Sequence, residues 1–121
     1  MANTFKVVTF AAEPASAGTP YVMYTVATST TTVVLGLVLS NINTTAVTAE
    51  VELVSTTSSR GGANNVANGT SFLIKDVNIP TGSSLEILSG GKVVLEAGDK
   101  IQIDCSVADK LSGTLSIVEI T

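Results

Sequence analysis

The chain has 121 residues, a length that suits one domain with a single hydrophobic core. Hydrophobic residues make up 45% and charged residues only 13%, well below the roughly 25% of an average soluble domain. The net charge is −4 and no two of the six cations are adjacent, so the sequence lacks the clustered cations that bind phosphates. We therefore expect no nucleic-acid partner.

Residue types that carry out catalysis are scarce. The chain has no histidine, which removes the common general base, the common zinc ligand and every Ser/His/Asp or Cys/His arrangement. Its one cysteine, Cys105, shares a strand face with Ile101 and Ile103 and is expected in the core. We predict that the protein is not an enzyme, has no catalytic residue and needs no cofactor.

Four carboxylates near the C-terminal end are the best remaining candidates for metal ligands, namely Glu96, Asp99, Asp104 and Asp109. Residues five apart on one strand point to opposite faces, so Asp99 and Asp104 should point away from each other. We interpret the four carboxylates as solvated surface groups and expect no metal site.

Membrane and export signals are absent from the sequence pattern. The longest nearly apolar run, "VVLGLVL", is too short to span a bilayer. The start, "MANTFKVV", lacks a basic region followed by a long apolar stretch, so we expect no signal peptide and no membrane partner.

Period-2 alternation and β-branched residues dominate the chain from end to end. Nine short strands separated by turn signals predict an all-β fold, an antiparallel β-sandwich of jelly-roll type with about eight to nine strands. Residues 1–121 should form this single domain. In chain order, the predicted strands are Thr4–Phe10, Tyr21–Ala27, Thr32–Ser40, Val47–Ser55, Ser71–Ile79, Ser84–Leu88, Lys92–Glu96, Lys100–Val107 and Thr114–Ile120.

Turn residues between these strands are compatible with short connections. Pro80 and Gly82 preset the backbone of one turn. "SGG", Ser89–Gly91, predicts a tight hairpin between its two flanking strands. "EAGD" places Gly98 where a positive φ is favourable and predicts a second hairpin, from Lys92–Glu96 to Lys100–Val107.

Alternation also assigns strand faces. In "VTAEVELV", the four apolar residues from Val47 to Leu53 should be buried, with Glu50 and Glu52 facing water. In "KIQIDCSV", Ile101, Ile103, Cys105 and Val107 should point inward.

Two strands, Thr32–Ser40 and Thr114–Ile120, are apolar on both faces. Such a strand is either covered on both sides within the fold or contributes to a subunit interface. We take the second possibility as the hypothesis, with Gly36 marking a bulge or a close backbone approach. The candidate interface residues on the first strand are Val34, Leu35, Leu37 and Leu39.

Two segments carry no strand pattern. Residues 11–20, "AAEPASAGTP", are small and bounded by proline, which predicts a flexible segment. Residues 56–70 form a long polar loop, and loops of this length are usually functional or disordered. Either this loop is disordered in the free protein or it becomes ordered against a partner, with Arg60 as the anchor and Asn64 and Asn65 as further contacts.

Two stretches resemble the small all-β virion proteins of tailed bacteriophages, including those of cyanophages. The first, Tyr24–Leu53, has a threonine-rich turn, a long strand ending in Ser-Asn and a strand of alternating valines. The second, Ile79–Ile120, contains "PTG", the "LEAGD" turn and a last strand ending in "SIVEI". Together they cover more than half of the chain.

The resemblance implies an assembly role without catalysis, inside a virion put together in the bacterial host cytoplasm. The expected function is a capsid decoration (cement) protein that binds the capsid lattice, with the major capsid protein or another virion protein as partner and a homo-oligomeric state. One alternative is a neck, tail or fibre-associated protein. A second alternative is a carbohydrate-binding β-sandwich module, whose aromatic candidates are Phe5, Phe10, Tyr21, Tyr24 and Phe72.

Overall fold

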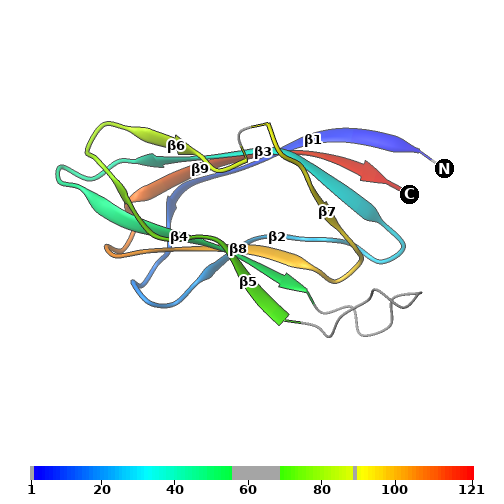
Figure 1. Cartoon of the computed structure of the whole chain (residues 1–121), viewed down its shortest axis with the longest axis horizontal. Coiled ribbons are helices and arrows are strands. Elements are labelled where there is room, and N and C mark those ends of the chain that lie inside the picture. Colours follow the sequence, from blue (N-terminus) through cyan, green and yellow to red (C-terminus); the bar gives the residue numbers. More distant parts are fainter. Residues whose placement is uncertain (1, 56–68, 89) are drawn as a thin grey trace.

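The computed structural model describes residues 2–55, 69–88 and 90–121. Two antiparallel sheets pack face to face, and the described residues contain no helix, so the predicted all-β sandwich is confirmed (Figure 1). The described residues form nine strands, namely β1 (Asn3–Glu13), β2 (Tyr21–Thr25), β3 (Thr31–Asn41), β4 (Val47–Ser55), β5 (Gly69–Ile79), β6 (Ser84–Glu86), β7 (Val93–Leu95), β8 (Lys100–Cys105) and β9 (Leu111–Ile120).

The strand order is that of a jelly roll. One sheet has the order β1-β9-β3-β6, with β7 also paired to β3, and the other has the order β2-β8-β4-β5. Both β6 and β7 run antiparallel to β3 along the same edge, β6 beside residues 38–40 and β7 beside residues 32–34. They are therefore two halves of one interrupted strand, and the chain folds as a ribbon of antiparallel pairs rolled into two sheets.

Both hairpins predicted in this region are wrong. Strands β6 and β7 pair with β3 and not with each other, so they form no hairpin, and Ser89 of "SGG" lies outside the described residues. Strands β7 and β8 belong to different sheets, so "EAGD" carries the chain from one sheet to the other, as Figure 1 shows. Gly98 does adopt the expected positive φ, +89°.

The turn after β7 is held by a carboxylate that we expected in solvent. Asp99 is only 2% exposed, and its Oδ2 accepts a hydrogen bond from the Glu96 N–H at 3.0 Å. Its backbone carbonyl accepts from the Val26 N–H at 2.9 Å, which ties the turn to the end of β2. The prediction of a solvated Asp99 is therefore wrong, because this side chain closes the turn.

A bulge in β3 explains why this strand reads as apolar on both faces. The pairing with β9 shifts between Val34 and Gly36, so Leu35 is an extra residue. The shift allows Val34 and Leu37, which are three residues apart, to point to the same side. Val34, Leu37 and Leu39 are all fully buried. The bulge predicted at Gly36 is confirmed.

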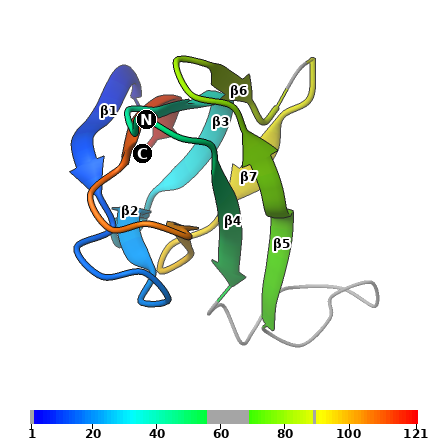
Figure 2. The same cartoon turned by 90° about the vertical axis from the view of Figure 1, so that its left-hand side faces the viewer.

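The core lies between the two sheets, whose backbones Figure 2 shows from one end of the molecule. Alternate residues of β3 and β9 face those of β4 and β8, and each fully buried Leu or Ile contributes roughly 1.5–3 kcal/mol. Cys105 lies among them, 3% exposed, as predicted. Val107 does not, because β8 ends at Cys105 and leaves the Val107 side chain 37% exposed, so its predicted inward position is wrong.

Strand β1 is fixed to the core at its far end. The Phe10 ring covers Gly113 of β9 so closely that a Cβ on this glycine would lie 2.2 Å from a ring carbon. The same ring contacts Tyr21 of β2, with 5.4 Å between ring centroids. The first residues of segment 11–20 continue β1 to Glu13, and a bridge between Ser16 and Thr19 follows.

Candidate interaction surface

The outer face of the five-stranded sheet carries an uninterrupted row of apolar side chains. Val118 of β9 lies opposite Phe5 of β1 on one side and opposite Val33 of β3 on the other, and Val33 lies opposite Val94 of β7. Directly paired residues in antiparallel strands project to the same face. We call these four residues the apolar row. Phe5 and Val94, at its two ends, are 74% and 57% exposed.

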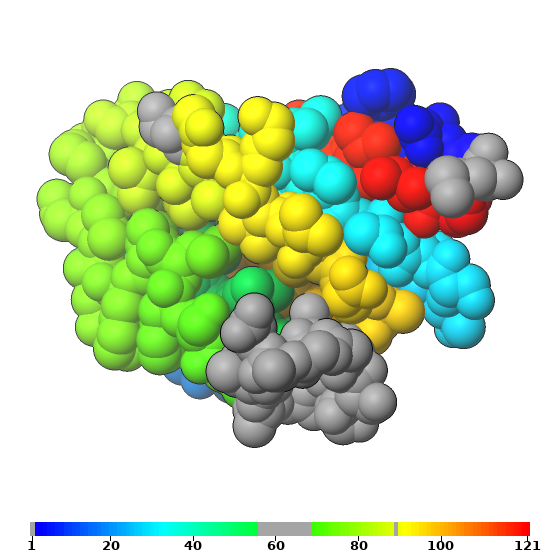
Figure 3. All heavy atoms as spheres, turned by 45° about the vertical axis from the view of Figure 1, so that its right-hand side comes forward, coloured from blue at the N-terminus to red at the C-terminus, as the bar shows by residue number. Residues whose placement is uncertain are grey.

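Three neighbours widen the row into an apolar surface. Val7 follows Phe5 on the same face of β1 and is 63% exposed. Leu35, the extra residue of the β3 bulge, is 38% exposed. Ile120 lies next to Val118 along β9 and is half-buried. In Figure 3 the N-terminal strand in blue, the C-terminal strand in red and the cyan segment that contains β3 lie side by side on this part of the molecule.

The other half of the same face is polar. Thr114 lies opposite Thr9 and Val38, and Val38 lies opposite Glu86. One row further, Ser40 lies between Ser112 and Ser84. The apolar surface is therefore confined to the end of the sheet where Ala2 and Thr121 exchange backbone hydrogen bonds. A bounded apolar patch with a polar surround is typical of an interaction site.

Most of the residues predicted for an interface are not exposed on the described part of the chain. Val34, Leu37 and Leu39 are fully buried in the core, so their assignment to an interface is wrong, and only Leu35 of that group reaches the surface. Arg60, Asn64 and Asn65, together with most of the predicted loop 56–70, lie outside the described residues. The loop does end earlier than predicted, because β5 begins at Gly69.

Sequence reasoning missed Phe5, Val7 and Val94. The signal was available in "TFKVVTF", where Phe5 and Val7 occupy one face and Val8 and Phe10 the other. This strand is apolar on both faces, as β3 and β9 are. Val94 lies in a three-residue strand too short for alternation to identify its face.

The outer face of the four-stranded sheet has the opposite character. Glu50 of β4 lies directly opposite Asp104 of β8, and Glu52 lies opposite Gln102, whose Nε2 donates to Glu52 Oε2 at 3.0 Å. Asp76 of β5 lines a hollow together with Glu50 and Asp104. We call Glu50, Glu52, Asp76 and Asp104 the acidic face.

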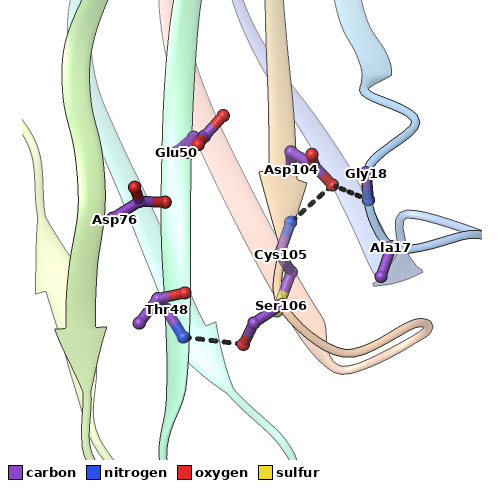
Figure 4. Close-up of a pocket in the computed structure, with 8 residues that line it drawn as sticks. All are labelled: Ala17, Gly18, Thr48, Glu50, Asp76, Asp104, Cys105 and Ser106. Atoms are coloured by element: carbon purple, nitrogen blue, oxygen red, sulfur yellow. Dashed lines mark hydrogen bonds between the residues drawn. The ribbon is translucent and has the colours of Figure 1, made fainter.

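The hollow has a volume of about 220 Å³, and Figure 4 shows the side chains that line it. Asp104 Oδ1 accepts hydrogen bonds from the Gly18 N–H at 3.1 Å and from the Cys105 N–H at 2.8 Å. Lys75 Nζ lies 3.1 Å from Glu50 Oε1. The carboxylates are thus engaged with donors of the fold, and no group of three potential ligands in the described part of the chain could hold a metal ion.

A polar network joins the strands beneath the apolar surface. The Tyr24 hydroxyl donates to Glu119 Oε2 at 2.6 Å, Lys6 Nζ lies 2.6 Å from Glu119 Oε1, and Thr32 Oγ1 lies 2.8 Å from the Tyr24 oxygen. Burial, helped by Glu119, raises the pKa of Tyr24 to about 12. The hydrogen bonds from Lys6 and Tyr24 lower the pKa of Glu119. These contacts tie β1 and β9 to the second sheet through β2.

The remaining reactive or aromatic groups do not gather into a site. Burial raises the pKa of the Cys105 thiol, which keeps it protonated at neutral pH. Phe5 and Phe72 are exposed on different sheets, and Lys75 Nζ lies 4.5 Å from the Phe72 ring centroid. Phe10 is buried against Tyr21. The aromatic residues considered for sugar binding therefore form no common platform.

Comparisons with protein-family models, with curated proteins and with solved structures give no match for this chain. Among the described residues, no helix is long and apolar enough to cross a membrane.

Proposed function

We propose that this chain is a structural protein of a bacteriophage virion, and that it decorates the capsid by placing its apolar surface on the lattice. The apolar row carries this proposal, since four paired side chains form a continuous apolar strip across four strands. The resemblance of Tyr24–Leu53 and Ile79–Ile120 to phage virion proteins supports the choice of partner. A rigid sandwich suits a contact that symmetry repeats many times.

The size of the surface fits a lattice contact better than a tight pairwise one. The apolar surface comprises seven residues, fewer than the roughly 20–30 that each partner contributes to a standard interface. A decoration protein binds firmly when it contacts several lattice subunits at once, because the overall affinity of linked contacts exceeds that of each contact alone. The predicted loop 56–70, with Arg60 as its anchor, is the proposed second contact.

Substitution at one end of the apolar row tests the contact. Val94→Lys introduces a charge at a 57%-exposed position, and Val22→Lys is the matched control at a 42%-exposed position on the outer face of the other sheet. We expect both variants to keep wild-type stability within about 0.5 kcal/mol. Val94→Lys should lower occupancy on particles of the encoding phage at least tenfold, whereas Val22→Lys should bind as the wild type does.

Quantitative mass spectrometry of the purified particles provides the readout, and cryo-EM gives the position. Hundreds of copies on the capsid support decoration, while a few copies at the neck or tail support the alternative of a neck, tail or fibre-associated protein. Absence of the chain from the particles refutes the virion proposal. Equal occupancy of Val94→Lys and Val22→Lys shows that the apolar surface is not the contact.

A further inference from the structure

Strand β1 is an open sheet edge with regular geometry. It pairs with β9 on one side, and no other described strand lies along its other side. The register is unbroken from Asn3 to Phe10 and shifts only beyond that point. An edge of this length displays a row of free backbone donors and acceptors to which another strand can add.

The hydrogen-bond pattern identifies which residues face the open edge. Ala2 and Thr121 exchange both backbone hydrogen bonds, at 3.1 and 3.0 Å. In an antiparallel ladder such pairs alternate with pairs that make no bond to each other. Thr4, Lys6 and Val8 therefore bond to β9, while the residues between them direct their N–H and C=O groups outward. The outward residues, Asn3, Phe5, Val7 and Thr9, carry the side chains of the outer face.

The other three sheet edges have features that prevent strand addition. Strand β2 has five residues and a register shift between Val22 and Tyr24. Strand β5 has shifted pairing with β4 and a positive φ of 52° at Asp76. The β6/β7 edge is interrupted. On β1 the only feature that opposes the addition of another strand is the charge of Lys6. This charge is matched by Glu119, whose Oε1 lies 2.6 Å from Lys6 Nζ.

We propose that β1 pairs antiparallel with β1 of a second copy of this chain, with the two Phe5 residues opposite each other on the two-fold axis. This inference concerns the purified chain and does not depend on the proposed virion role. The outward residues of the two strands then face each other, Asn3 opposite Val7 on either side of Phe5. The apolar row continues without a break from one copy into the other.

The positions of charged and apolar side chains favour the register centred on Phe5 over the registers centred on Lys6 or Val7. With Phe5 at the centre, Lys6 lies opposite Thr4 of the second copy, and one strand further lies Glu119 of that copy. A register centred on Lys6 would place two like charges opposite each other, which is unfavourable. A register centred on Val7 would place Phe5 opposite Thr9 and break the apolar row.

The proposed dimer has a limited area. A single strand pair buries less than the roughly 1,200 Å² of a stable interface, so association should depend on concentration. Sedimentation velocity over about 1 μM to 1 mM covers the range in which such a dimer forms. A wild-type chain that stays monomeric over this whole range overturns the proposal.

Proline at an outward position tests the edge. Val7→Pro removes an N–H that β9 does not use, so the ladder within the chain stays intact. Val7→Ala trims the side chain but keeps the N–H and is the matched control. We expect Val7→Pro to weaken dimerisation about tenfold or more relative to Val7→Ala, because two symmetry-related hydrogen bonds are lost. Equal association of the two variants overturns the edge assignment.

Cysteine cross-linking tests the register independently. In the proposed pairing the Cα atoms of residue 5 are about 5.5 Å apart, within disulfide range. Phe5→Cys should therefore form a covalent dimer under mild oxidation, and Val7→Cys should not. Cys105 is 3% exposed and does not compete. Cross-linking of Val7→Cys without Phe5→Cys overturns the register. Because purified protein is used throughout, neither outcome depends on particle binding.

Discussion

The outer faces of the two sheets differ although both sheets follow the same alternation inside. The four-stranded sheet turns its acidic face to solvent, and each inward residue of β4 from Val47 to Val51 is buried. The five-stranded sheet buries an equally apolar inner face but presents the apolar row on its outside. A sandwich needs one apolar face per sheet, so the second apolar face of the five-stranded sheet requires an explanation other than folding.

The largest expected effect comes from a charge on the buried face of β3. Leu37→Glu would place a carboxylate at a position that is 0% exposed between the two sheets. The lost burial of roughly 1.5–3 kcal/mol adds to the cost of burying the charge, so the total approaches the 5–15 kcal/mol stability of a typical domain. We expect Leu37→Glu to be unfolded by circular dichroism.

Leu35→Glu is the matched control. It introduces the same charge at the bulge residue of the same strand, where the side chain is 38% exposed. This variant should fold and lose about 1 kcal/mol or less. Wild-type thermal stability of Leu37→Glu would contradict the placement of Leu37 in the core.

A smaller effect is expected where β1 is anchored to the inner face. Gly113→Ala forces the Phe10 ring to move, because the new Cβ would meet a ring carbon at 2.2 Å. Such overpacking costs about 1–3 kcal/mol, measured by urea unfolding. Gly36→Ala is the matched control, since its Cβ would meet nothing within 4 Å. Equal stability of the two variants would contradict the packing of Phe10 on Gly113.

The smallest effect concerns the network under the apolar surface and its pH dependence. The raised pKa of Tyr24 adds stability that is complete below pH 10 and is lost as the pH rises through about 12. The lowered pKa of Glu119 adds stability that is complete above its ordinary value of 4.5 and is lost as the pH falls. Glu119→Gln should remove the acid-side contribution and part of the alkaline one.

Absorbance titration of tyrosinate separates the causes. Glu119→Gln should lower the pKa of Tyr24, but not fully to 10, because burial is the largest cause of the shift. Thr32→Val should raise the pKa further, since the hydrogen bond from Thr32 lowers it. Shifts of the same sign in the two variants would contradict the network.

Local pattern was sufficient to predict the number of strands and the inner faces of β4 and most of β8. It failed where the pairing of a strand depends on residues far away in the sequence. The "SGG" stretch has hairpin chemistry, yet both flanking strands pair with β3, which lies some fifty residues earlier. The sequence also could not show that Val34 and Leu37 point to the same face, because the extra residue of the bulge reverses the alternation between them.

Three of the residues predicted for an interface, Val34, Leu37 and Leu39, lie on the buried face of β3. A strand that is apolar on both sides indicates a second buried surface, but composition does not say which side faces the second sheet. The bulge at Leu35 moved Leu37 and Leu39 to the side of Val34, leaving Val33 and Leu35 outside. The residues of the apolar row become neighbours only once β1, β3, β7 and β9 are aligned.

The pairing of Ala2 with Thr121 also determines how the domain bears force. The first and last strands are adjacent and antiparallel, so tension applied to both ends would load their hydrogen bonds one pair at a time. Strands whose hydrogen bonds break one pair at a time separate at a lower force than strands pulled in shear, where all the bonds are loaded together. We therefore expect the domain to open first between β1 and β9 when both of its ends are pulled, starting at the end where the apolar row lies.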